Sequence, residues 1–516
     1  MSSKHYRNPV ISGFHPDPSI CRDGDDYYLV TSSFEYFPGV PLFHSKDLVH
    51  WRQIGHCLTR TSQLELRQAG SSAGIFAPTI RVHNDKFYMI TTNISSGGNF
   101  FVYADDPRGE WSEPVFIDQP GIDPDLFFDE DGTVYVTSSA SSEATGAGIY
   151  QSRIDLTTGK RLSDCVFLWP GTGGQYPEAP HIYRIGEWYY LLISEGGTEY
   201  GHMVTVARSK RPDGGFESCP YNPILTHRSL FKPIHATGHA DIVQTPDGEW
   251  WAVFLGIRPV GYPKRHHLGR ETFLAPVTWT EDGWPIFGDN GTIGETMPAG
   301  GLKLQPETVP PLSARDGFNR DKLEPHWTFL RSPNPDNWSL TAKQGCLTLY
   351  GSPATLNDVG VPAFVGRRQQ HFECRVSAQL TFAPRNDGEE AGITIYMNER
   401  FHYEIAVAKI AGERKLIFRR RLGSLWKVEN EAPWHEDRGV IIIKADRERY
   451  TFGFSSADGA GVPFRFGEGE CAMLATEVAG GFTGVMIAMY ATGNGSVSES
   501  PAHFDWFEYE AVEEKG

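Results

Sequence analysis

Apolar and polar positions over the first three hundred residues repeat one pattern five times. Each copy is an apolar run, a polar turn and an aromatic-rich run, which is typical of a β-hairpin. An aromatic residue marks the second strand of each hairpin, at Tyr28, Tyr88, Tyr135, Tyr189 and Trp251. Repeats of about 50 residues that carry several strands each are typical of propeller blades. The pattern predicts a five-bladed β-propeller over residues 1–303.

The chain changes character after the fifth hairpin. Residues 304–314, LQPETVPPLSA, are rich in proline and have no periodicity, which favours a linker. Alternating or β-branched runs broken by turns follow, such as EAGITIYMNERFHYEIAVAK, and predict a β-sandwich over residues 315–516. Because 516 residues exceed what one hydrophobic core usually supports, we expect an all-β chain of two domains.

Charge and cysteine content exclude several classes of function. The formal net charge of -17 gives no global attraction for phosphates or anionic lipid, so we expect neither nucleic acid nor membranes as partners. The seven cysteines are scattered and never form a CxxC pair, which indicates neither a zinc site nor a disulfide framework. The first residues contain no apolar signal segment, and we therefore expect a cytoplasmic protein.

A short stretch stands directly before each hairpin, and three of the five place a carboxylate at the same phase of the repeat. These are HPDPS with Asp17, IDPDL with Asp123 and PEAPH with Glu178. Turn chemistry explains one such motif, but it does not require an acid at the same phase of three repeats. Equivalent positions of a propeller surround one axis, so we expect the three acids to converge on a central pocket. We interpret the prolines as rigid spacers that hold the preceding residue in an extended conformation.

Converging carboxylates repel one another, so at least one of the three should have a raised pKa. A protonated acid beside an ionised one is what hydrolysis of a neutral acetal needs. A binding protein would gain little from this arrangement, because buried like charges cost desolvation and repulsion.

Longer motifs, in this order along the chain, resemble glycoside hydrolase family 43, in particular its two-domain β-xylosidase and α-L-arabinofuranosidase members. They are GFHPDPSICRDGDDYYLVTSSFEYFPGVPLFHSKDLVHW, GIDPDLFFDEDG, YPEAPHIY, SEGGTEYGHMVTVARS, ATGHADIV and LGRETFLAPVTW. The resemblance implies a five-bladed propeller, a concanavalin-like second domain and hydrolysis with inversion. It also implies that Asp17 is the general base, Glu178 the general acid, and Asp123 the carboxylate that tunes the pKa of the acid and orients it.

The resemblance further implies contacts to the substrate. Arg270 would donate to sugar hydroxyls, with a structural salt bridge to the adjacent Glu271 as the alternative, and Thr198 is a further candidate contact. Phe34 and Phe76 are candidate walls for the pentose ring, with a role in the core as the alternative. The family commonly has Trp where this chain has Phe76, which puts the sugar preference in doubt.

Two more residues are implied by the resemblance alone. His239 would lie beneath the pocket, where it either contacts the catalytic carboxylates and the substrate or ligates a structural Ca²⁺ in the axial channel. No cofactor is required for the chemistry itself. Phe482, in GGFTGVM, would come from the second domain to the pocket rim, with the sandwich core as the alternative. A closed pocket admits only a chain end.

These observations together predict an exo-acting, inverting glycoside hydrolase that releases terminal β-D-xylose from short xylo-oligosaccharides. An α-L-arabinofuranosidase activity is the alternative, either as a side activity or as the main one. A carbohydrate-binding protein without turnover is the alternative from a different class, because fold alone does not establish chemistry. The oligomeric state stays open, with a homo-oligomer as one outcome.

Overall fold

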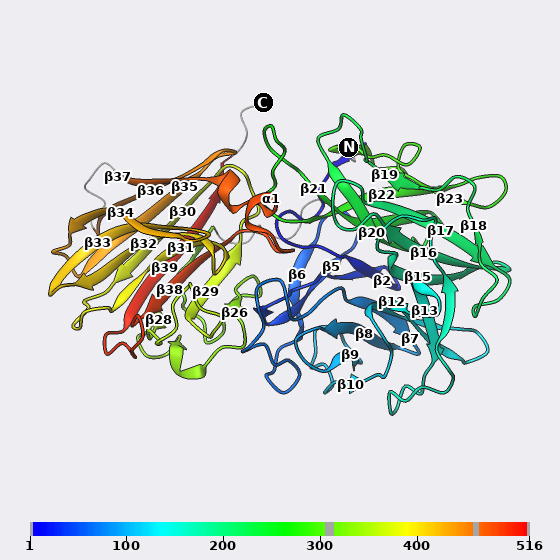
Figure 1. Cartoon of the computed structure of the whole chain (residues 1–516), viewed down its shortest axis with the longest axis horizontal. Helices are drawn as coiled ribbons and strands as arrows, with labels where there is room; N and C mark the ends of the chain where they lie inside the picture. The colour runs from blue at the N-terminus through cyan, green and yellow to red at the C-terminus, as the bar shows by residue number, and fades with distance from the viewer. Residues whose placement is uncertain (1–3, 305–313, 458–463, 513–516) are drawn as a thin grey trace.

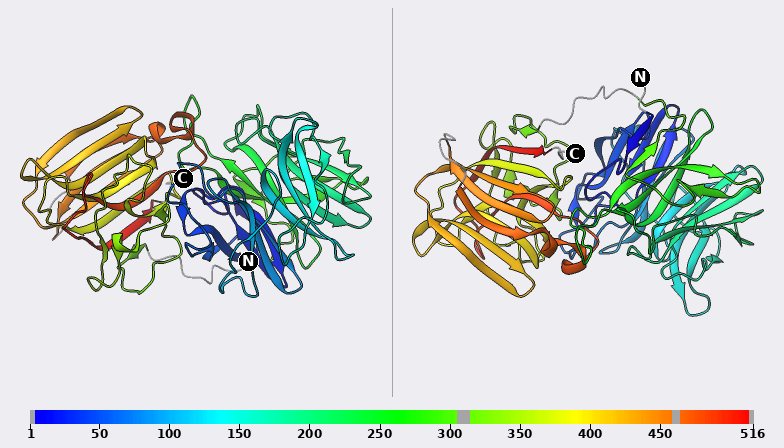
Figure 2. Two further views of the ribbon diagram at one scale, coloured as in Figure 1. Left: turned by 60° about the horizontal axis from the view of Figure 1, so that its bottom comes forward. Right: turned by 90° about the horizontal axis from the view of Figure 1, so that it is seen from above.

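The computed structural model describes residues 4–304, 314–457 and 464–512. Two β domains stand side by side, a propeller and a sandwich, with the segment around α1 (Thr476–Ala479) at the boundary between them (Figures 1 and 2). The predicted linker 304–314 lies outside the described residues except for its two ends. The predicted all-β class is confirmed.

Five antiparallel sheets form the blades of the propeller, each with its first strand nearest the axis. The first blade contains β2 (Ser19–Asp23), β3 (Asp26–Val30), β5 (Gly39–Ser45) and β6 (Arg52–Leu58). The second contains β7 (Thr79–His83), β8 (Lys86–Asn93), β9 (Gly98–Ala104) and β10 (Val115–Phe116). The third contains β11 (Ile122–Phe128), β12 (Val134–Ser142), β13 (Gly146–Arg153) and β14 (Val166–Trp169).

The fourth and fifth blades complete the ring. The fourth contains β15 (Glu178–Ile185), β16 (Trp188–Glu195), β17 (Met203–Ser209), β18 (Glu217–Ser218) and β19 (Leu225–Thr226). The fifth contains β20 (His235–Gln244), β21 (Trp250–Ile257), β22 (Glu271–Trp279) and β23 (Pro285–Phe287). The inner strands β2, β7, β11, β15 and β20 contact one another in turn around the axis. Pairing of β1 (His5–Arg7) with β24 (Thr296–Pro298) brings the two ends of the propeller chain together.

The second domain consists of two sheets and short helices. One sheet contains β25 (Arg315–Asp316), β27 (Trp338–Ser339), β28 (Leu347–Leu349), β30 (Cys374–Thr381), β35 (Arg438–Ala445), β36 (Arg449–Ser456), β37 (Phe464–Glu470) and β39 (Ala502–Ala511). The other contains β29 (Ala363–Arg368), β31 (Glu390–Asn398), β32 (Phe401–Ile410), β33 (Glu413–Leu422), β34 (Leu425–Pro433) and β38 (Met486–Thr492). The short 3₁₀ helices are η1 (Pro335–Asn337) and η2 (Cys471–Leu474).

The hydrophobic pattern explains why these strands pack as they do. β31 is buried along its whole length and lies between β32 and β38, whereas β34 forms an exposed edge of the same sheet. All seven cysteines are free thiols, six of them buried. Within the described residues, no helix has the length and apolar character needed to cross a bilayer.

A short strand pair joins the two domains. β26 (Phe329–Leu330) of the second domain pairs with β4 (Tyr36–Phe37) of the propeller. Directly after β26, the fully buried Arg331 donates from Nε to the carbonyl of Ala69 in the propeller at 2.6 Å, and from Nη1 to the carbonyl of Gly360 at 3.0 Å. One guanidinium therefore satisfies carbonyl groups from both domains.

Replacing Arg331 by Met should lower the free energy of unfolding by about 2–4 kcal/mol, because one buried and one partly buried carbonyl lose their donor. Urea unfolding followed by fluorescence measures this loss. Arg320→Met is the matched control, since Arg320 is exposed and its ion pair with Glu324 should contribute less than about 1 kcal/mol. Equal stability of the two variants would contradict the inferred role of Arg331.

Candidate active site

The residues that begin the inner strands share an unusual backbone conformation. Asp17, Asp123, Ala179 and His239 have φ between 51° and 56°, in the left-handed region that side chains other than glycine rarely adopt. In β11, β15 and β20, the register with the next strand shifts beside these residues, which is the mark of a bulge. Repeated bulges therefore turn the starts of the inner strands toward the axis.

This geometry corrects the interpretation of the prolines. Asp17 precedes Pro18 and Asp123 precedes Pro124, and both aspartates were expected to be extended. Their φ values of 56° and 55° are left-handed instead. The prolines restrict the chain after each acid, but the bulge conformation is what directs the acid.

Asp17 is buried and surrounded by donors. Its Oδ2 accepts a hydrogen bond from the hydroxyl of Ser32 at 2.5 Å, and its Oδ1 accepts one from Nη1 of Arg270 at 2.7 Å. Burial by itself would raise the pKa of Asp17, but Arg270, His239 and the hydroxyl of Ser32 outweigh it and lower the pKa below its ordinary value. Asp17 is therefore ionised at neutral pH and suited to accept a proton.

Glu178 and Asp123 have the opposite environment. In the described part of the chain, no group donates a hydrogen bond to the Glu178 carboxyl, and Asp123 accepts only the backbone N–H of Ala179, at 3.2 Å on Oδ2. Burial, then Asp123 and Asp17, raise the pKa of Glu178 well above its ordinary value. Burial and the charge of Asp17 raise the pKa of Asp123 to about 7. Glu178 therefore retains a proton where Asp17 has lost one, which is the division of roles that acid–base chemistry needs.

Arg270 connects the acids to the second domain. The predicted alternative, a salt bridge to the adjacent Glu271, is not what the structure shows, because Glu271 pairs with Arg258 at 2.7 Å. The guanidinium of Arg270 instead contacts Asp17, the hydroxyl of Thr198 at 3.2 Å and the backbone carbonyl of Phe482 at 3.2 Å. Arg270 directly precedes β22, which begins at Glu271, and the two neighbouring side chains bind different partners.

Three phenylalanines that the sequence singled out lie together beside Arg270. Phe482 stacks on Phe34 with ring centroids 6.1 Å apart and meets Phe76 edge-on at 6.2 Å. Phe482 is 42% exposed and therefore stands at the rim rather than in the sandwich core, whereas Phe34 is only 2% exposed. The amide of Phe482 also donates to the hydroxyl of Ser72 in the propeller, at 2.8 Å. Segments from two domains thus form one aromatic wall.

His239 lies beneath Asp17, with Nδ1 3.7 Å from Oδ1 of that carboxylate. Its backbone N–H donates to Ser194 at 2.5 Å, and burial lowers the pKa of its imidazole to about 4 despite the nearby charge of Asp17. The carboxylate of Asp17 is already bound by Arg270 and Ser32, and no group of three or more His, Cys, Asp or Glu among the described residues is placed to hold a metal. A Ca²⁺ held at His239, as the resemblance implies, would therefore take most of its six to eight oxygen ligands from water.

A guanidinium fills the axis below the three acids. Arg81 contacts Asp125 at 3.0 Å, Asp241 at 2.7 Å and Nδ1 of His181 at 3.0 Å, and it thus joins the second, third, fourth and fifth blades. Tyr183 donates to the same Asp241 at 2.5 Å. This buried network separates the candidate site from the far end of the axis.

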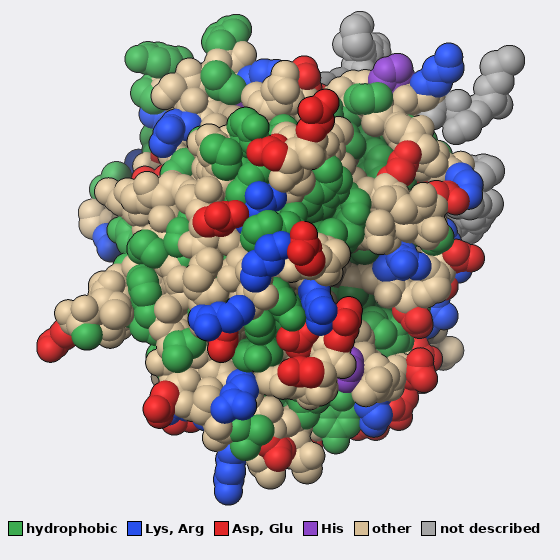
Figure 3. Space-filling view, turned by 90° about the vertical axis from the view of Figure 1, so that its right-hand side faces the viewer, with side chains coloured by type: hydrophobic (Ala, Val, Ile, Leu, Met, Phe, Trp, Pro, Cys, Tyr) green, Lys and Arg blue, Asp and Glu red, His purple; other side chains and the backbone are tan. Residues whose placement is uncertain are grey.

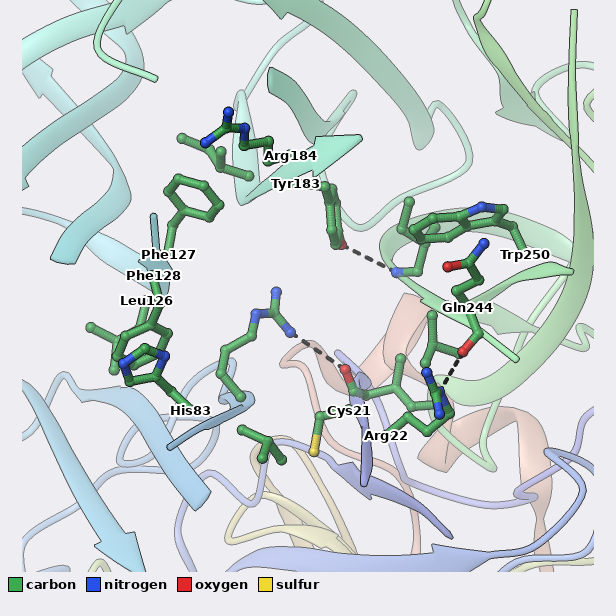
Figure 4. Close-up of a pocket in the computed structure, with 16 residues that line it drawn as sticks. Cys21, Arg22, His83, Leu126, Phe127, Phe128, Tyr183, Arg184, Gln244 and Trp250 are labelled. Atoms are coloured by element: carbon green, nitrogen blue, oxygen red, sulfur yellow. Dashed lines mark hydrogen bonds between the residues drawn. The ribbon is translucent and has the colours of Figure 1, made fainter. Parts of the chain in front are cut away.

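A pocket of about 400 Å³ opens at that far end, where the inner strands finish. The stacked rings of His83 and Phe128, 4.2 Å apart, lie on one side of it and Trp250 on the other (Figure 4).

The side of the molecule turned away from the sandwich carries acidic and basic side chains interspersed (Figure 3). The strong net charge is therefore not gathered into a single patch on this face.

Sequence reasoning missed Ser32, Arg81 and His202, although all three bind or face the candidate site. Ser32 and His202 stand within stretches that carried the resemblance, but a hydroxyl or an imidazole has no recognisable role until its partner is known. The partners of Arg81 lie one, two and three blades further along the sequence. The signal that would have found Arg81 is a charged residue within a predicted inner strand, seen when the repeats are compared with one another.

Comparison with known proteins extends these observations to the whole chain. Residues 6–285 match the model of glycosyl hydrolases family 43, and residues 315–510 match the model of the beta xylosidase C-terminal concanavalin A-like domain. A non-reducing end alpha-L-arabinofuranosidase of Bacteroides ovatus is 42% identical, covering 99% of this chain and 96% of that protein. A xylosidase/arabinosidase of Butyrivibrio fibrisolvens is 40% identical, covering 98% and 99%. The solved structure of a xylan beta-1,4-xylosidase from Bacillus halodurans superposes with a TM-score of 0.92 at 32% identity, covering 98% of this chain and all of that one.

Arg270→Met should make the stability of the fold less sensitive to acid. In the wild type the lowered pKa of Asp17 contributes stability above the unfolded pKa, and this contribution is lost as the pH falls through the folded pKa. Without Arg270 only weaker interactions, among them those with His239 and Ser32, oppose the burial of Asp17, so its pKa rises and that contribution shrinks. The difference in Tm between wild type and variant, measured from pH 4 to pH 7, should therefore widen toward neutral pH.

Asp17→Asn tests the assignment of this effect. Once Asp17 cannot ionise, adding Arg270→Met should leave no pH-dependent difference in Tm that can be traced to this pair. A pH dependence that persists in the double variant would place the effect elsewhere.

Proposed function

Because this chain belongs to glycosyl hydrolase family 43, we propose that it releases single terminal pentoses, β-D-xylose foremost, from the non-reducing end of short xylo-oligosaccharides. The chain is an inverting glycoside hydrolase. The observation that carries the proposal is the contrast between the buried carboxyl of Asp17 and the partly exposed carboxyl of Glu178. Asp17 accepts hydrogen bonds from Arg270 and Ser32, whereas Glu178 receives none from the described residues.

Inversion needs a base for water on one side of the sugar ring and an acid for the leaving oxygen on the other. Asp17 would take a proton from water as the water oxygen attacks the anomeric carbon. Glu178 would give its proton to the glycosidic oxygen as that bond breaks. Asp123 would keep Glu178 protonated, because a second negative charge beside it is unfavourable. The two products, the released sugar and the alcohol, together contain all the atoms of the substrate and the water.

The aromatic wall supports action at a chain end. Phe482 comes from the second domain and closes the side of the site that Phe34 and Phe76 begin. Arg270 is 6% exposed and bound to Asp17, and among the described residues its Nε–H has no partner, which leaves one guanidinium donor for a sugar hydroxyl beside the base. A site narrowed by both domains would accept one terminal ring and exclude the interior of a polymer.

α-L-Arabinofuranosidase is a second candidate main activity, and the comparisons favour it specifically. The relative from Bacteroides ovatus bears that name, and the relative from Butyrivibrio fibrisolvens is named for both sugars. Phe76 adds a structural reason, since a phenyl ring is a smaller platform than an indole. Small differences in such contacts decide between pentoses, because one contact changes rates by about 10-fold to 200-fold.

Substitution of the two acids should separate their roles. Asp17→Ala removes the base and should lower kcat/KM by about 100-fold or more on every substrate. Glu178→Ala should lower kcat/KM strongly on xylobiose but much less on 4-nitrophenyl β-D-xylopyranoside, whose leaving group hardly needs a proton. Steady-state kinetics of both variants on both substrates measures this. Full activity of either variant on xylobiose would show that the assigned role is wrong.

Rates on two nitrophenyl glycosides should decide the sugar. We expect kcat/KM for 4-nitrophenyl β-D-xylopyranoside to exceed that for 4-nitrophenyl α-L-arabinofuranoside at one pH, by about 10-fold or more if a single ring contact discriminates. The reverse order would make the arabinofuranosidase the main activity. Phe76→Trp is an informative companion variant, since it restores the larger platform and should change the ratio without abolishing turnover.

A further inference from the structure

His202 is a fully buried residue directly before β17 whose two ring nitrogens have different partners. Nδ1 lies 3.1 Å from the backbone carbonyl oxygen of Ala236. A carbonyl oxygen only accepts, so Nδ1 must carry the hydrogen of this bond. A neutral imidazole has a single N–H, and Nε2 therefore presents a lone pair.

The imidazole of His202 stays neutral. Burial lowers its pKa to about 3, although the bond to Ala236 and the charge of Asp17 act in the opposite direction, and His239 and Arg270 add to the lowering. At any pH where the fold is used, His202 can accept a hydrogen bond through Nε2 but is too weak a base to remove a proton from a carboxylic acid.

The free lone pair faces Glu178. Nε2 of His202 lies 3.8 Å from Oε1 of that carboxyl, about 1 Å beyond a normal hydrogen bond. Nε2 is buried and has no hydrogen-bond partner among the described residues. The side chain of Glu178 is 19% exposed, so a small rotation of its carboxyl can close the gap. Contacts of this kind are often long before substrate binds.

A glycine leaves the space that the ring occupies. Gly238 lies in β20 between two register shifts, and a Cβ at that position would overlap the imidazole of His202. Ala236, which accepts from Nδ1, has a left-handed φ of 53° in the same segment. The bulged strand thus provides both the acceptor that sets the tautomer and the clearance that places the ring.

We propose that His202 is a positioning residue for the proton of Glu178: its bare Nε2 accepts from the protonated carboxyl and disfavours the ionised one. This inference rests on the role proposed for Glu178. In the free enzyme the Glu178 O–H bond points at Nε2. When substrate arrives, the glycosidic oxygen replaces Nε2 as acceptor, takes the proton and leaves as an alcohol, while Asp17 accepts the proton of the attacking water.

Several other groups act on the same carboxyl. Asp123 from β11 and Asp17 from the start of the first blade also favour the protonated form of Glu178, and Arg270 opposes it. His202 differs from them because its effect requires a lone pair rather than a charge. Removing the Nε2 acceptor should therefore remove the contribution of His202 to the protonated form of Glu178 and leave the acids and Arg270 in place.

His202→Phe tests the proposal, since it keeps a ring of similar size and removes the acceptor. The alkaline limb of the pH profile of kcat/KM on xylobiose should move down by about one pH unit, and the rate above that limb should fall about 10-fold. The rate on 4-nitrophenyl β-D-xylopyranoside should change much less. His202→Gln places an amide oxygen near the position of Nε2 and should restore part of the wild-type profile.

Two further variants separate this role from a structural one. His227→Phe removes another buried imidazole, which contacts the carbonyl of Ile234 at 2.7 Å, and should cost stability without moving the alkaline limb. His202→Asn keeps an N–H near Nδ1 but is too short to face Glu178, so it should shift the limb as His202→Phe does. His202→Asn decides the question if the phenylalanine variant does not fold.

The pH dependence of Tm supplies a readout that needs no turnover. The difference in Tm between the wild type and Glu178→Gln reports the raised pKa of Glu178. The stability that this carboxyl contributes is present below its pKa in the unfolded chain and is lost as the pH rises through its pKa in the folded protein. In the His202→Asn background this loss should finish at a lower pH. An unchanged alkaline limb and an unchanged Tm difference would overturn the proposal, whereas a shifted Tm difference without any turnover would leave it standing and reject the proposed function instead.

Discussion

The pairing of Arg270 with Asp17 is the interaction on which the rest of the site depends. Three carboxyls converge where the inner strands begin, and burial alone would favour the protonated form of all three. One guanidinium and one hydroxyl are directed at a single member, Asp17, and no equivalent donor is directed at Glu178 by the described residues. Chemically similar side chains thereby acquire opposite protonation states. The asymmetry comes from the positions of donors rather than from the acids themselves.

The second domain takes part in this asymmetry. Arg270 reaches the backbone carbonyl of Phe482 at 3.2 Å, and Ser72 accepts from the amide of the same residue. The strand pair between β26 and β4, together with Arg331, joins the two domains at a second place. Correct docking of the sandwich is therefore a condition for the orientation of the guanidinium, and so for the ionisation of Asp17.

Periodic features of the molecule could be predicted from the sequence. Five hairpins in phase indicated the propeller, and three acids at one phase indicated the pocket, because a repeat places equivalent positions around one axis.

Features that depend on a partner far away in sequence could not be predicted. Arg270 was assigned Glu271 as its alternative partner because the two are neighbours, yet Arg270 pairs with Asp17 and Glu271 with a different arginine. The left-handed backbone at Asp17 was missed because proline favours the opposite expectation, and only the bulge explains it. The tautomer of His202 depends on the carbonyl of Ala236, which no sequence pattern reports.

The contact between Arg270 and residue 482 uses a main-chain oxygen, and this has an evolutionary consequence. Every amino acid supplies that carbonyl, so the hydrogen bond that orients the guanidinium does not depend on which side chain stands at position 482. The ring of Phe482, by contrast, contributes to the wall of the site through its size alone. Substitutions at position 482 can therefore widen or narrow the opening of the site while Asp17 stays ionised. Descendants of one ancestral enzyme can change the sugars they accept without first losing the chemistry.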